Sequence, residues 1–100
     1  MPYTSPLGGT ITAADTTAHA FPTGPARMIV ITTPSANVGS ITISDTAGIA
    51  GGNLTGGIPV AKGTGSGSLP PLVLGPLQNL ESLAYQSANA NDVLNFIVFR

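Results

Sequence analysis

The chain has 100 residues, of which 42% are hydrophobic and only 7% are charged, and its formal net charge is −1. This length forms one domain around one core, and so apolar a composition does not fit a disordered chain. Three basic side chains are too few for the positive patch that nucleic-acid binding requires. Because ordinary soluble domains carry about 25% charged residues, this surface has little charge to keep copies apart, and we expect an obligate oligomer.

Other classes of protein are disfavoured by what the sequence lacks. It contains no cysteine, which removes disulfides, thiolate chemistry and cysteine-based metal sites. No apolar run approaches the roughly 18–20 residues that cross a membrane, so we expect no membrane partner. The N-terminus has neither a basic start nor an apolar segment, and we therefore expect no signal peptide.

The first nine residues predict an extended arm. They include Pro2, Pro6, Gly8 and Gly9 and show no periodic pattern. Such an arm either frays or is pinned onto a neighbour. We expect Pro2, Tyr3 and Pro6 to contact the surface on which the protein assembles, and a single domain to occupy residues 10–100.

Two short β-type runs follow, and a proline- and glycine-rich turn over residues 21–25 ends the second. Residues 27–33 form the next strand. Its centre is a continuous apolar run that includes Ile29 and Ile31, so it should be buried on both faces. Residues 40–45 alternate, with Ile41 and Ile43 inward. Together the two strands predict a hairpin over residues 28–45.

The middle of the chain is rich in glycine and proline. Residues 48–57 predict a mobile or tightly turning loop, and 62–68 a flexible one. The strand at 58–61 contains Pro59 and therefore suits a sheet edge. Leucines at every third position, Leu77, Leu80 and Leu83, predict a single 3₁₀ turn.

The last strand, residues 92–100, is apolar on both faces. Leu94, Phe96 and Val98 lie on one face, whereas Val93, Ile97 and Phe99 lie on the other with Asn95 between them. A strand of this kind needs cover on both sides, and we expect another chain to cover the second face. The predicted subunit-interface residues are Val93, Ile97, Phe99, Ile29 and Ile31.

About eight short strands separated by glycine and proline turns are typical of an antiparallel β-sandwich or jelly roll. The predicted strands cover residues 10–14, 16–21, 27–33, 40–45, 58–61, 69–74, 83–87 and 92–100.

No set of side chains predicts catalysis. His19, the only histidine, lies between two alanines and should be a strand residue that points to solvent. A Ser–His–Asp mechanism needs the histidine to be oriented by a third group, which no motif supplies. Most of the four acidic residues lie in turn-like sequence, where carboxylates accept backbone N–H bonds. We therefore expect no enzyme activity, no metal and no cofactor.

The order of features in the second half resembles the small β-sandwich virion proteins of tailed bacteriophages. The resemblance covers residues 27–99 and depends on four segments in sequence. They are Ile-Thr-Ile-Ser-Asp at 41–45, Gly-Ile-Pro-Val-Ala-Lys-Gly at 57–63, Leu-Glu-Ser-Leu-Ala-Tyr-Gln-Ser-Ala at 80–88, and Asp-Val-Leu-Asn-Phe-Ile-Val at 92–98.

This resemblance implies a structural role without catalysis. The protein would be a decoration or cement protein on the capsid surface, a homotrimer whose partners are its own copies and the major capsid protein or another virion protein. The alternatives are a head-fibre or tail component, and a receptor- or glycan-binding module that uses its glycine-rich loops.

Overall fold

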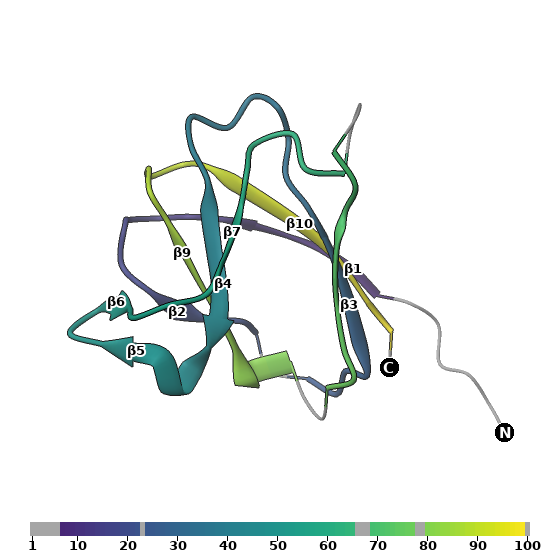
Figure 1. Cartoon of the computed structure of the whole chain (residues 1–100). Helices are drawn as coiled ribbons and strands as arrows, with labels where there is room; N and C mark the ends of the chain where they lie inside the picture. The colour runs from purple at the N-terminus through teal and green to yellow at the C-terminus, as the bar shows by residue number, and fades with distance from the viewer. Residues whose placement is uncertain (1–6, 23, 66–68, 78–79, 100) are drawn as a thin grey trace, which may run out of the picture.

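The computed structural model describes residues 7–22, 24–65, 69–77 and 80–99. Two four-stranded antiparallel sheets pack against each other, and a two-stranded ribbon lies beside them (Figure 1). The strands are β1 (Leu7–Thr12), β2 (His19–Ala20), β3 (Met28–Thr32), β4 (Ile41–Asp45), β5 (Ile49–Ala50), β6 (Asn53–Leu54), β7 (Ile58–Val60), β8 (Leu72–Leu74), β9 (Leu83–Ser87) and β10 (Val93–Phe99), and the 3₁₀ turns are η1 (Thr46–Gly48) and η2 (Leu80–Ser82).

The strand order is that of a jelly roll. One sheet has the order β1-β10-β3-β8 and the other β2-β9-β4-β7. Apart from the β5–β6 ribbon, the chain changes sheet at every step except β4 to β7, which produces the two interlocking Greek keys of this fold. The predicted antiparallel sandwich is therefore confirmed.

The hairpin predicted over residues 28–45 is wrong. β3 pairs with β10 and β8, whereas β4 pairs with β9 and β7 in the other sheet. Both strands present isoleucines to the same core from opposite sides, so the loop between them must bridge the two sheets. In this fold, strands pair with partners that are distant in the sequence. The short loop between β3 and β4 therefore does not show which strands pair.

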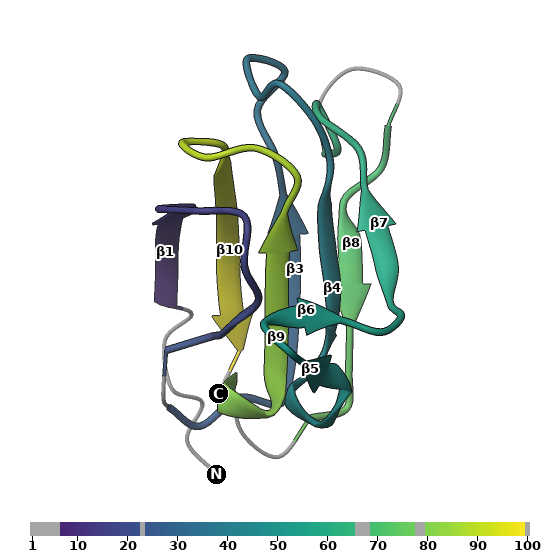
Figure 2. The ribbon, with the colours of Figure 1, turned by 90° about the vertical axis from the view of Figure 1, so that its left-hand side faces the viewer.

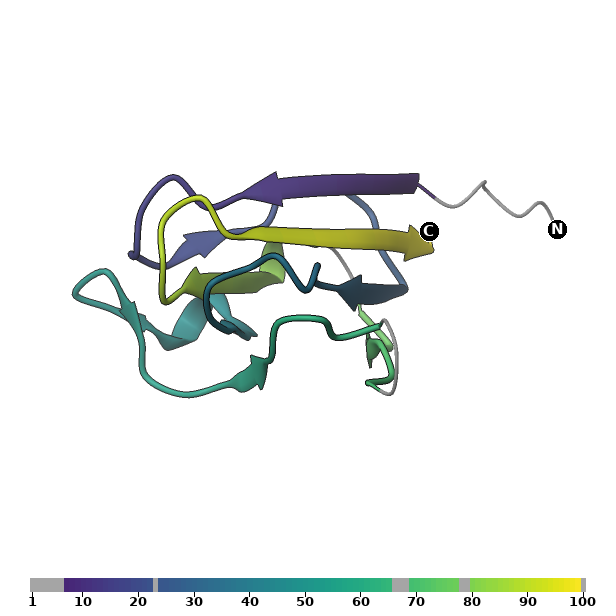
Figure 3. The same cartoon turned by 90° about the horizontal axis from the view of Figure 1, so that it is seen from above.

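The predicted N-terminal arm of residues 1–9 ends before residue 9. Leu7, Gly8 and Gly9 belong to β1 and pair with β10, with Gly9 opposite Phe96. Figure 3 shows β1 and β10 side by side and running in opposite directions. Pro2, Tyr3 and Pro6 lie outside the described residues.

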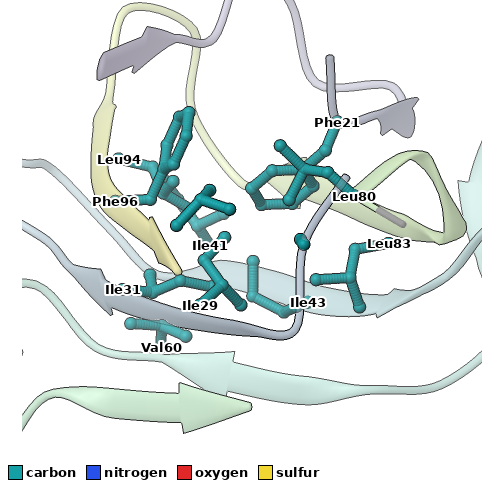
Figure 4. Packing of buried hydrophobic residues seen from close by; sticks show 12 residues of the cluster. Phe21, Ile29, Ile31, Ile41, Ile43, Val60, Leu80, Leu83, Leu94 and Phe96 are labelled. Carbon is teal, nitrogen blue, oxygen red and sulfur yellow. The ribbon is translucent and has the colours of Figure 1, made fainter. Parts of the chain in front are cut away.

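The core lies between the sheets (Figure 4). The alternation predicted for the last strand is confirmed, because Leu94, Phe96 and Val98 are buried while Ile97 is exposed. Phe96 packs edge-on against Phe21, with 5.9 Å between ring centroids. The buried cluster comprises Phe21, Ala26, Ile29, Ile31, Ile41, Ile43, Val60, Leu80, Leu83, Leu94, Phe96 and Val98.

Gly9 leaves room for the ring of Phe96, and filling that room should destabilise the fold. A Cβ atom at Gly9 would lie 2.6 Å from Cζ of Phe96, whereas one at Gly8 would meet only a carbonyl oxygen at 3.8 Å. We expect Gly9→Ala to lower the free energy of unfolding by about 1–3 kcal/mol through overpacking, as measured by urea denaturation. Gly8→Ala is the matched control and should be neutral or stabilising. Equal stability of the two variants would contradict this packing.

The glycine-rich segment 48–57 forms a tight turn, one of the two predicted outcomes. β5 and β6 pair as a hairpin whose two loop residues, Gly51 and Gly52, have φ angles of 60° and 81°, as a type I′ turn requires. Figure 2 shows this hairpin lying across β9 and β4. The predicted 3₁₀ turn is also confirmed as η2, and Pro59 lies in β7, an edge strand as predicted.

Candidate functional site

One face of the β1-β10-β3-β8 sheet points away from the core and is apolar. Cross-strand pairing places Ile97 between Gly8 and Val30, and Val30 beside Val73. This row crosses all four strands, and Phe99 and Met28 form a second pair beside it. We call this surface the outer apolar face, and its residues are Met28, Val30, Val73, Val93, Ile97 and Phe99.

The outer apolar face is open to solvent and carries no charge. Ile97 is 45% exposed and Val73 is 52% exposed, and they belong to one contiguous row, whereas isolated exposed apolar side chains are ordinary on a protein surface. Polar side chains lie at its margin, where Thr10 donates a hydrogen bond of 2.9 Å to Oδ1 of Asn95. Contiguous exposed apolar surface with a polar rim is typical of an interaction site.

Two of the five predicted interface residues are placed differently by the structure. Val93, Ile97 and Phe99 lie on the outer apolar face, but Ile29 and Ile31 are fully buried in the core. They cannot contact another subunit without unfolding the sandwich. Met28 and Val30, which alternate with them, are the residues of β3 that face outward. Val73 also lies on this face but was not among the predicted residues, because its position beside Val30 follows only from the strand register.

A second cluster joins Asp15, Thr17 and His19 at the entry to β2. Oδ1 of Asp15 accepts hydrogen bonds from the backbone N–H of Thr17 at 2.9 Å and from its hydroxyl at 2.7 Å, and lies 2.8 Å from Nε2 of His19. The hydrogen bonds from the Thr17 side chain, the His19 ring and the Thr17 backbone lower the pKa of Asp15 from 3.8 to about 2.

This cluster lacks the relay geometry of a catalytic triad. A triad histidine uses one ring nitrogen for the carboxylate and the other for the nucleophile, whereas Asp15 and Thr17 both contact Nε2 of His19. The Thr17 hydroxyl also donates its proton to Asp15, so the ring does not activate it. As predicted, His19 is a strand residue with a partly exposed side chain, 41% accessible.

The lowered pKa of Asp15 should make stability depend on acidity. Because the folded-state pKa lies below the unfolded value, the contribution of Asp15 is complete above about pH 4 and is lost as the pH falls through about 2. We expect Asp15→Asn to lower the melting temperature at pH 6, and this difference from the parent to shrink between pH 4 and pH 2. Circular dichroism melts across this range measure it. A difference that stays constant with pH would contradict the assignment.

The remaining carboxyl groups have structural roles in loops, as predicted for acidic residues in turns. Asp45 accepts the N–H of Gly48 at 2.9 Å, and Glu81 accepts the N–H of Gly24 at 3.1 Å. Asp92 is buried and accepts two N–H groups of the β3–β4 loop. Among the described residues, no three histidine, aspartate or glutamate side chains come together as a metal site would require.

Fold and site together define the class of this protein: a small jelly-roll sandwich with one uncharged, apolar outer sheet face. No protein-family model matches the chain, and comparison with curated proteins and with solved structures also gives no match. The described part of the chain contains no helix long and apolar enough to span a membrane.

Proposed function

We propose that this chain is a structural protein of a tailed-bacteriophage particle, a decoration or cement protein that assembles on the capsid surface. The observation that carries the proposal is the outer apolar face, which extends without charge across all four strands of one sheet. The jelly roll is compatible with this role but does not specify it, since the same architecture hosts many functions. The four ordered segments that resemble phage virion proteins supply the biological setting.

The occupant of the outer apolar face is a second copy of this chain, in a homotrimer that turns the face toward a common axis. A face without charged side chains offers nothing to a strongly charged partner, because complementary charge is what guides such partners. Identical chains with a net charge of −1 repel one another weakly. In a closed symmetric oligomer, the outer apolar face of every copy is covered by another copy.

The energy of this contact is modest. Fully burying an aliphatic side chain contributes about 1.5–3 kcal/mol, and Ile97 and Val73 are already about half buried. Each therefore contributes about 1 kcal/mol per copy, or about 6 kcal/mol over three copies. The cost of association is about 4–15 kcal/mol, so assembly requires the whole face, and attachment to the shell at several points adds to its strength.

Composition of purified particles tests the virion role. Quantitative mass spectrometry of gradient-purified particles should find this chain in a fixed, multi-copy ratio to the major capsid protein. Particles produced without it should lose their genome at a lower temperature, and the added protein should restore heat resistance. Absence of the chain from purified particles would overturn the proposal.

A further inference from the structure

The opposite side of the molecule carries an open polar cleft of about 390 Å³, within the roughly 300–1,000 Å³ of small-ligand sites. Its floor is the outer face of the β2-β9-β4-β7 sheet, where Thr42 lies directly opposite Gln86. The loop before β2 and the β5–β6 hairpin contribute the wall residues Thr16 and Asn53. Figure 2 shows that the hairpin crosses β9 and β4. The lining residues are Thr16, Ser40, Thr42, Asn53, Gln86, Ser87 and Ala88.

Gln86 fixes the walls of this cleft. Its Nε2 donates to the carbonyl of Thr16 at 2.9 Å and to Oδ1 of Asn53 at 2.7 Å, and its Oε1 accepts the N–H of Leu54 at 2.8 Å. One strand residue thus ties together a loop and a hairpin that are distant in the sequence. The cleft is held open by these bonds before any ligand arrives, which lowers the entropic cost of binding.

Several polar groups in the cleft remain available for a ligand. Within the described part of the chain, the hydroxyl groups of Thr16, Ser40 and Thr42 make no hydrogen bond, whereas that of Ser87 is used by the carbonyl of Asn89. A hydroxyl both donates and accepts. No lining residue is ionisable or aromatic.

We infer that this cleft binds a neutral saccharide, an activity beyond the proposed assembly role. Sugar hydroxyls donate and accept in the same way as the hydroxyls of Thr16, Ser40 and Thr42. The lining offers no positive charge to an anionic ligand. The free-energy cost of removing such a ligand from water would therefore not be offset. Without an aromatic stacking platform a single site binds weakly, and repeated display on an assembly raises the avidity.

Amide chemical shifts of the full-length, assembled protein test this inference. Neutral hexoses and N-acetylhexosamines at tens of millimolar serve as probes, with sialic acid and inorganic phosphate as charged comparisons. At least one neutral sugar should shift the amides of Thr42, Leu54 and Gln86. Thr42→Val, which keeps the shape of the side chain and removes its hydroxyl, should weaken that binding about three- to tenfold.

Ser44→Ala is the matched control, since Ser44 lies on the same face of the same strand and does not line the cleft. It should leave the affinity unchanged, and the unchanged fold of both variants is visible in the same spectra. The inference is overturned if no neutral sugar shifts the cleft amides, if the charged probes shift them as strongly, or if Thr42→Val binds as well as the parent. None of these outcomes bears on assembly through the opposite sheet.

Discussion

An Ile97→Asp variant is expected to stay folded but to lose the oligomer. Ile97 lies at the centre of the outer apolar face and is 45% exposed, so a carboxylate there remains hydrated in the isolated subunit. In the assembly the same carboxylate would be desolvated beside its symmetry copies. The combined penalty should raise the dissociation constant at least a hundredfold, or about 3 kcal/mol. Light scattering after size-exclusion chromatography measures the mass.

Ile58→Asp provides a matched control for this variant. Ile58 is also an isoleucine in a strand and is also 45% exposed, but it lies on β7 in the other sheet. This variant should retain the oligomer. Ile29→Asp should instead unfold the chain, because Ile29 is fully buried. If Ile97→Asp and Ile58→Asp have the same mass as the parent, the outer apolar face is not the interface.

Removal of the Asp92 carboxylate should cause a large loss of stability. Asp92 is 3% exposed, and its two oxygens accept the N–H groups of Val38 at 2.8 Å and Gly39 at 3.0 Å. These bonds hold the β3–β4 loop, which bridges the two sheets, against the start of β10. Two hydrogen bonds to a charged group contribute about 3–6 kcal/mol together. We expect Asp92→Ala to lower the free energy of unfolding by about this amount.

Urea denaturation compares this variant with Asp45→Ala. Asp45 accepts a single N–H, that of Gly48, in an exposed turn, so its loss should cost no more than about 1 kcal/mol. Asp92→Asn retains one acceptor oxygen, so its free energy of unfolding should lie between those of Asp92→Ala and Asp45→Ala. A free energy of unfolding for Asp92→Ala equal to that of Asp45→Ala would show that the loop is held by other contacts.

The strands themselves were predictable because alternation and turn chemistry are local. All eight strands of the two sheets lie within or overlap the predicted ranges, and β9 matches its range fully. In β10, Asn95 marks the outward face, so the inward set was assigned correctly. The run from Met28 to Ile31 contains no polar residue, and nothing in it distinguishes one face from the other. This is why Ile29 and Ile31 were assigned to the wrong side.

The polar cleft could not be predicted for a different reason. It depends on hydrogen bonds between segments that are far apart in the sequence. Gln86, for example, donates to Thr16, and the two residues are 70 positions apart. The sequence pattern predicts only that Gln86 is a polar residue on the outward face of a strand. The only local signal was the Gly51-Gly52 pair, which is typical of a tight hairpin but does not indicate which surface the hairpin covers.

The central position of β10 has a consequence for folding. This strand lies between β1 and β3 in the middle of its sheet. Until β10 is in place, β1 has no partner in that sheet and β3 is paired on one side only. A folding intermediate that lacks β10 therefore exposes open backbone edges, which favour association with other chains.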